Sequence, residues 1–294
     1  MRELCWTVLP EEQGRTVRSL VPRRFCLGTH AFRRLNVREA ILRNGVPVRA
    51  DERLFAGDRL TVHLESEEGA CPGKDSALCT LVYADEDLLV VSKGAPLPTL
   101  PSGHQPGDTL RELLARRLGL LPDRFCYHPV NRLDKGTSGL LVVARHAHAQ
   151  RLLSGALHTD RFRREYLALT QGILPADEGT IDAPIARLGS GARRGIVAEG
   201  KPAQTHYRVL STDGERALLR LRLFTGRTHQ IRVHLQSLGC PILGDYLYGA
   251  PDPRLPGRFA LHAASLVLRH PLRDEELRFE SPLPPELQRL SPPL

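Results

Sequence analysis

Residues 128–145 read HPVNRLDKGTSGLLVVAR, and this stretch is the most informative part of the 294-residue chain. Its first half is polar and charged, whereas an apolar run from Gly139 to Ala144 follows directly. A charged loop that leads into a buried strand holds a functional side chain rigidly. Asp134 lies between Arg132 and Lys135, two cations that keep a carboxylate ionised and able to act as a base or nucleophile. The alternative is a surface turn in which Asp134 caps only its own loop.

On either side of this stretch, strand and helix patterns mix without a regular βαβ order, which favours the α+β class. Asp108 is expected to cap a helix that carries leucines along one face. The proline-rich residues after Ser281 are expected to form a loose tail. Alternating apolar positions predict strands at residues 80–83, 88–91, 139–144, 165–170 and 217–224, the first two forming a hairpin.

The chain is expected to divide into two domains. Residues 1–64 form a compact basic module with twelve arginines, seven carboxylates and a net charge of +5. Residues 65–78 contain acids, glycines and a proline but little to bury, so we expect a linker there. Residues 79–294 would then form the larger domain, which carries the charged stretch around Asp134.

Within the basic module, a helix is predicted from Phe32 to Asn44, with Arg34 and Arg38 four residues apart on one face. Gly45 is expected to end this helix. Short strands are predicted after it, at 46–48 and 60–64, so that the order is a helix first and then a small sheet.

The charge balance indicates the kind of partner. The chain carries 41 basic and 33 acidic residues, a formal net charge of +8, and 37 of the basic residues are arginines. Arginine suits phosphate and stacks on bases, which favours nucleic acid, although a GC-rich genome would also enrich it. Six scattered cysteines show no zinc-site spacing and are expected to be reduced. No apolar run approaches the roughly 18 residues of a membrane span, and we expect a cytoplasmic protein with no membrane contact.

Three segments, in the expected order, resemble the RluA-type pseudouridine synthases, which isomerise uridine in RNA. Residues 131–145 are similar to their RLD-x-x-TSG motif, and REYLAL at 164–169 and TGRTHQIRVHL at 225–235 match the other two. The resemblance extends over about residues 80–284 and implies a mixed, largely antiparallel catalytic sheet. Residues 1–64 resemble the small α/β RNA-binding domain first seen in ribosomal protein S-four, through the helix, the NGVPV turn and the AGDRLTV ending.

The resemblance implies a role for each matching residue. Asp134 falls on the catalytic aspartate, and Tyr166 on a tyrosine that stacks on the target base and assists proton removal. Arg227 aligns with the arginine that pairs with the catalytic aspartate. Arg132 matches the arginine that fills the gap left by the flipped uridine. Asn131 stands where the family usually has histidine, and we expect a structural variant that keeps hydrogen bonding near the RNA.

The implied reaction breaks the bond between nitrogen 1 of uracil and the ribose, turns the base and rejoins it through carbon 5, with no cofactor and no metal. The partner would be structured RNA, expected to be ribosomal with transfer RNA as the alternative, bound by a monomer with the help of Arg34 and Arg38. A catalytically silent RNA-binding or ribosome-assembly factor is the competing function. A nucleosidase or glycoside hydrolase would need a second carboxylate beside Asp134, and Glu165 is expected to point away from Tyr166 on its strand.

Overall fold

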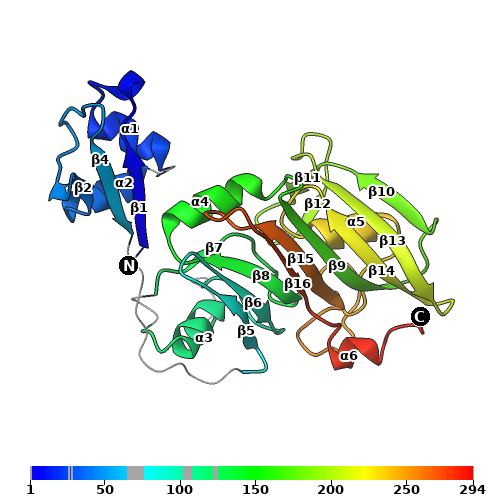
Figure 1. Ribbon diagram of the computed structural model, residues 1–294. Coiled ribbons are helices and arrows are strands. Elements are labelled where there is room, and N and C mark those ends of the chain that lie inside the picture. The colour runs from blue at the N-terminus through cyan, green and yellow to red at the C-terminus, as the bar shows by residue number, and fades with distance from the viewer. Residues whose placement is uncertain are drawn as a thin grey trace.

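The computed structural model of the protein describes residues 2–25, 27, 29–64, 76–101, 108–121 and 125–293. Within these residues, a small sheet near the N-terminus and a large sheet each have their own buried core, and a two-stranded ribbon is added to the large one (Figure 1). Most of the expected linker, residues 65–75, lies outside the described residues. Among the described helices, none combines the length and apolar character that crossing a membrane requires.

The small sheet is antiparallel and packs against two helices, α1 (Val17–Arg24) and α2 (Thr29–Val37). Val17, Leu20 and Ile41 are among the fully buried side chains that form its core. A single 3-10 turn at Pro10–Glu12 precedes the helices. The strand order is β1 (Arg2–Thr7), β4 (Arg59–Leu64), β2 (Ile41–Arg43) and β3 (Val46–Pro47).

Two predictions for this region are wrong. The helix expected from Phe32 to Asn44 ends at Val37, because Glu39 takes a left-handed conformation (φ 54°) and Ile41 pairs with Val62 in the sheet. Asn44 and Gly45 both have positive φ, 52° and 85°, as a tight Asn-Gly hairpin turn requires, so they join two strands. The sheet also contains β1, which precedes the helices, so the order of a helix first and a sheet afterwards does not hold.

The large sheet confirms the α+β class and the largely antiparallel arrangement, since β8 and β15 form the one parallel pair among its described strands. All the strands predicted for this part of the chain are present. The sheet also contains strands that were not predicted, and its spatial order is β10 (Glu178–Asp182), β13 (Gln204–Thr212), β14 (Arg216–Leu223), β9 (Phe162–Gln171), β15 (Leu261–Arg269), β8 (Ser138–Ala144), β6 (Leu88–Lys93) and β5 (Cys79–Ala84). Strand β16 (Glu276–Glu280) pairs with β15, β7 (His128–Pro129) pairs with β8, and β11 (Ile185–Arg187) and β12 (Arg194–Ile196) form the ribbon.

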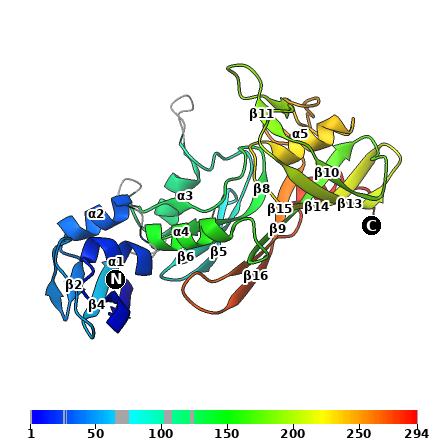
Figure 2. The ribbon, with the colours of Figure 1, turned by 90° about the horizontal axis from the view of Figure 1, so that it is seen from above.

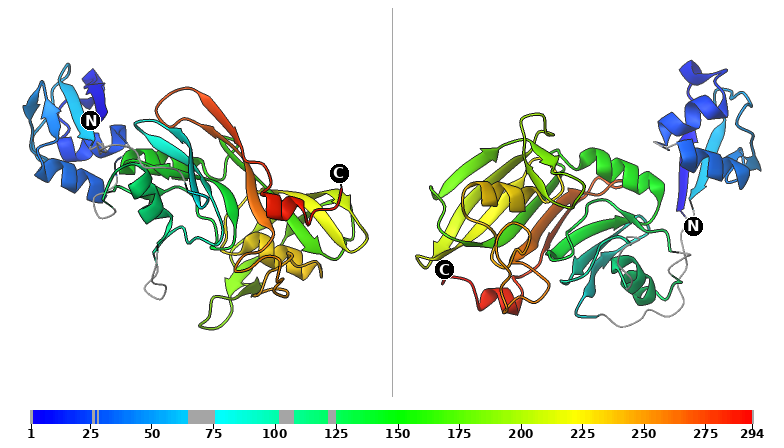
Figure 3. Two further views of the ribbon diagram at one scale, coloured as in Figure 1. Left: turned by 90° about the horizontal axis from the view of Figure 1, so that it is seen from below. Right: turned by 180° about the vertical axis from the view of Figure 1, so that it is seen from behind.

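Helices cover both faces of the large sheet. Helices α3 (Leu110–Arg117) and α5 (Gln230–Ser237) lie on one face, as Figures 2 and 3 show, and contribute to the largest buried cluster. Helix α4 (Ala147–Ala156) packs on the other face, where Leu153 joins a second cluster. Every residue of β8 is buried between these layers, which explains the apolar run from Gly139 to Ala144.

Two details of the larger region differ from expectation. Thr109, rather than Asp108, caps α3, since its hydroxyl accepts a hydrogen bond from the backbone N–H of Arg111. Asp108 pairs instead with Arg116. The C-terminal residues are not a loose tail, because α6 (Pro285–Gln288) places Leu287 in the main buried cluster.

Candidate active site

The loop that carries Asp134 is held by its backbone. Thr99 donates its hydroxyl proton to the carbonyl of Leu133 at 2.7 Å, and the backbone N–H of Thr137 donates to the carbonyl of Asp134 at 3.0 Å. Gly136 is required because a Cβ at this position would lie 2.7 Å from the ring of Phe259. The loop therefore presents Asp134 in one conformation just before β8 begins.

Lys93 stabilises this loop from the interior of the protein. Its ammonium donates to the carbonyls of Gly94 and Leu97 at 2.9 and 2.8 Å, and Leu97 in turn donates its backbone N–H to the carbonyl of Lys135. Burial lowers the pKa of Lys93 to about 7, although the charge of Asp134 acts in the opposite direction. The lysine is 1% exposed, so it positions the loop from inside the protein.

Arg232 is the counter-ion of Asp134. One terminal nitrogen of its guanidinium donates to Oδ2 of Asp134 at 3.0 Å, while Nε and the other terminal nitrogen bind both oxygens of Asp245 at 2.7 and 2.8 Å. The central carbon of the guanidinium also lies over the rings of Tyr248 and Phe259, 4.9 and 4.3 Å from their centroids. Burial alone would lower the pKa of Arg232, but the hydrogen bonds and charges of the two carboxylates raise it above its ordinary value. The arginine thus stays charged and fixed in orientation.

The expected pairing of Arg227 with Asp134 is wrong. Arg227 precedes α5, which begins only at Gln230, and its Nε donates to the carbonyl of Pro202 at 2.9 Å. The side chain of Gln230 accepts hydrogen bonds from the backbone N–H of Arg227 and the hydroxyl of Thr225, which keeps this segment outside the helix. Arg227 nevertheless lines the same pocket as Asp134.

Tyr166 lies on β9 beside Asp134 and lines the same pocket. It is 5% exposed, and burial raises the pKa of its hydroxyl. Glu165 faces the other side of the sheet, where it lies 3.9 Å from Arg220, as strand alternation predicts. The pocket measures about 560 Å³, which is enough for a nucleotide, and Asp134 is its one carboxylate among the described residues. The described pocket lining therefore offers no second carboxylate of the kind that a nucleosidase or glycoside hydrolase needs.

The predicted RNA-contacting residues fall in different places. Arg132 is exposed and lines the pocket. Asn131 is buried, and its side-chain oxygen accepts the backbone N–H of Val142 at 3.0 Å, so it builds the loop as a structural variant would. Arg34 and Arg38 are exposed on and just after α2, away from the pocket lining.

His229 is a site residue that the sequence reasoning missed. Its backbone takes a left-handed conformation (φ 61°), and its Nε2 lies 3.9 Å from Oδ2 of Asp134. Nδ1 lies 2.8 Å from the hydroxyl of Tyr248, which accepts the backbone N–H of Arg194. These hydrogen bonds fix the orientation of the imidazole ring, with Nε2 facing Asp134. Burial lowers the pKa of His229, which favours the neutral ring.

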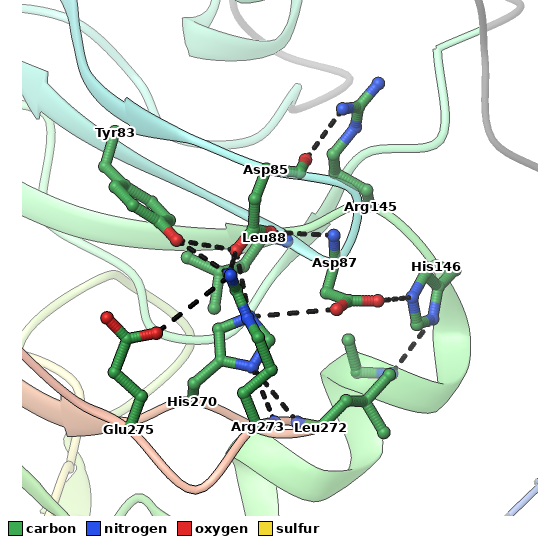
Figure 4. Close-up of polar contacts among 11 residues, drawn as sticks. Tyr83, Asp85, Asp87, Leu88, Arg145, His146, His270, Leu272, Arg273 and Glu275 are labelled. Atoms are coloured by element: carbon green, nitrogen blue, oxygen red, sulfur yellow. Dashed lines mark hydrogen bonds and ion pairs between the residues drawn. The ribbon is translucent and has the colours of Figure 1, made fainter. Parts of the chain in front are cut away.

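A separate polar cluster, shown in Figure 4, joins three turns of the chain. Its residues do not line the pocket. Asp85 accepts hydrogen bonds from the hydroxyl of Tyr83 at 2.7 Å and from Nε2 of His270 at 2.9 Å, and it also pairs with Arg273. Asp87 binds His146 at 3.0 Å. Asp85, Asp87 and His270 are close enough to hold a metal, but these hydrogen bonds and the Arg273 cation already satisfy them. The cluster connects the β5–β6, β8–α4 and β15–β16 turns.

Comparison with known proteins identifies the family. The family model described as RNA pseudouridylate synthase matches residues 87–237. An uncharacterised RNA pseudouridine synthase of Bacillus subtilis, YjbO, is 36% identical over 249 residues, covering 84% of this chain and 88% of the relative. Ribosomal large subunit pseudouridine synthase D of Haemophilus influenzae is 36% identical over 256 residues, covering 81% and 78%. The solved structure of human RNA pseudouridylate synthase domain containing 1 matches with a TM-score of 0.58 and 28% identity, over 75% of this chain and 91% of that one.

The chain belongs to the RNA pseudouridylate synthase family. It is an isomerase that converts uridine to pseudouridine in RNA.

Proposed function

We propose that this enzyme modifies a uridine in ribosomal RNA and that Asp134 is its catalytic carboxylate. The observation that carries the assignment is the contact between Asp134 and Arg232 at the wall of a nucleotide-sized pocket. Ribosomal RNA as the substrate is supported by relatives named as ribosomal large subunit pseudouridine synthases. This action on ribosomal RNA would take place in the cytoplasm, with the enzyme as a monomer.

In the proposed mechanism, the uridine enters the pocket with its ribose near Asp134 and its base against Tyr166. An ionised carboxylate can attack the ribose or remove a proton from it, and both courses release the bond to nitrogen 1. Arg232 orients the carboxylate, and His229 places a ring nitrogen 3.9 Å from it. The Tyr166 hydroxyl would assist removal of the proton from carbon 5 after the base has turned.

We also assign RNA binding to Arg132, which lines the pocket, and to the basic N-terminal module. The exposed, planar Arg132 at the pocket rim suits the space that the flipped uridine leaves in the stack. The module, residues 1–64, has a net charge of +5 and its own core, and its exposed Arg34 and Arg38 would contact phosphates. It would add affinity and no chemistry, as an S-four-like domain joined to a catalytic domain.

Tritium release from ribosomal RNA labelled at carbon 5 of uridine tests the catalytic assignment. We expect Asp134→Asn to bind RNA as the wild type does and to release no tritium. Asp177→Asn, an exposed carboxylate away from the pocket, is the matched control and should keep full activity. Near-normal turnover by Asp134→Asn would disprove its role, and mapping pseudouridines in cells with and without the protein identifies the RNA.

A further inference from the structure

Arg164 is a buried cation with no carboxylate partner in the described part of the chain. It lies two residues before Tyr166, on the same buried face of β9, and is 7% exposed. One terminal nitrogen donates to the carbonyl of Leu157 at 3.3 Å, and Nε has no hydrogen-bond partner among the described residues. A buried positive charge without a counter-ion destabilises a folded protein, unless an anion from outside the chain binds to it.

The pocket that contains Asp134 is the place where such an anion can reach Arg164, which lines it. Two further basic side chains, His158 and Arg227, line the pocket as well. The pKa of His158 is lowered, first by burial and then by the positive charges of Arg164 and Arg227. His158 therefore lies near both cations, and an anion that enters this part of the pocket meets three basic side chains.

Gly226 keeps the approach to Arg164 open. A Cβ at this position would lie 3.2 Å from Cε1 of His158 and 3.9 Å from both terminal nitrogens of Arg164. Only hydrogen atoms occupy that place in the native chain. A ligand oxygen can therefore approach the guanidinium from the side of Gly226.

We propose that Arg164, with Arg227 and His158 beside it, binds a backbone phosphate that flanks the target uridine. A guanidinium fork suits two phosphate oxygens better than any other side chain does. Arg164 is near enough to Tyr166 for its charge to lower the pKa of that hydroxyl, against the larger effect of burial. The phosphate would therefore lie next to the stacked base and fix the ribose toward Asp134. This inference rests on the proposed function, because it assigns the pocket to one RNA nucleotide.

Binding of small nucleotides tests the phosphate site without any need for turnover. We would titrate the full-length wild type with uridine, uridine 5′-monophosphate and uridine 3′-monophosphate and follow the bound nucleotide by NMR. At least one monophosphate should bind about tenfold or more tightly than uridine, and Arg164→Gln should abolish this difference. Arg164→Lys, which keeps the charge and loses the fork, should retain part of it and guards against misfolding of the glutamine variant.

Arg163→Gln is the matched control, since Arg163 lies on the same strand, partly exposed, and is 3.9 Å from Glu276. It removes the same charge and should leave the preference for the monophosphate unchanged. The proposal is overturned if the wild type shows no preference for either monophosphate, if Arg164→Gln keeps it, or if Arg163→Gln loses it equally. Tritium release is measured in parallel, so an enzyme that binds phosphate through Arg164 yet releases no tritium would contradict the proposed function alone.

Discussion

Replacing Arg232 by methionine should lower both the free energy of unfolding and the turnover rate. Asp245, which is fully buried, would lose two hydrogen bonds of 2.7 and 2.8 Å and keep an uncompensated charge. Removing one partner of a buried ion pair costs about 3–5 kcal/mol, a large part of the roughly 5–15 kcal/mol that stabilises a typical protein. Urea unfolding at neutral pH, followed by circular dichroism, measures this loss. Asp134 would also lose its 3.0 Å partner, so tritium release should fall.

A second substitution separates the two effects. Combining Arg232→Met with Asp245→Asn removes the stranded charge, and we expect most of the stability to return while turnover stays low. Arg220→Met, which removes an exposed arginine, should change the unfolding free energy by about 0.5 kcal/mol or less. Arg227→Met should cost only about 1 kcal/mol, the worth of the side-chain hydrogen bond that Arg227 donates to the carbonyl of Pro202. If Arg232→Met unfolds like the Arg220 control, the buried ion-pair argument is refuted.

Three further predictions concern other parts of the molecule. Tyr166→Phe should keep RNA affinity and slow tritium release, because the ring remains and the hydroxyl is lost; an unchanged rate would leave the ring alone as the functional part. Replacing Arg34 and Arg38 together by glutamine should reduce the log–log salt slope of RNA binding by roughly 0.7–0.9 per lost phosphate contact, and equal slopes would contradict the anchoring role. Burial lowers the pKa of His262 to about 4, whereas an unfolded histidine titrates near 6.5. The unfolded chain therefore takes up this proton first, so stability should fall by up to about 3 kcal/mol as the pH drops through that window. Urea unfolding across this range should show a flatter pH dependence for His262→Gln, and an unchanged dependence would count against the assignment.

The larger region was predictable from its sequence because its patterns are local. The apolar run of β8 and the alternation along β14 each report burial directly, and both strands occur where they were expected. The helix predicted over residues 32–44 is longer than α2. Leu35 and Leu42, one heptad apart, fit a helical period, but Leu42 lies in β2, where its neighbour Ile41 pairs with Val62. The Asn44–Gly45 dipeptide was the available signal for a hairpin, and it outweighs a weak helical period.

The site was only partly predictable because its partners are distant in the chain. Asp134 and Tyr166 lie in recognisable motifs, and both line the pocket. Whether Arg227 or Arg232 pairs with Asp134 depends on where α5 begins. The buried side chain of Gln230 determines that start through its hydrogen bonds to Thr225 and Arg227. No local pattern reports those contacts.

The contact between Asp134 and Arg232 joins residues 98 positions apart in the sequence. The hydrogen bonds of Ser138 to Arg258 and His262 join residues 120 and 124 positions apart. Contacts of such high sequence separation form late in folding, after long loops have closed. During translation, a nascent chain already exposes Asp134 and Tyr166 long before the arginine that orients the carboxylate has been synthesised. We therefore expect prematurely terminated chains to be inactive toward RNA, so that activity itself reports completed synthesis.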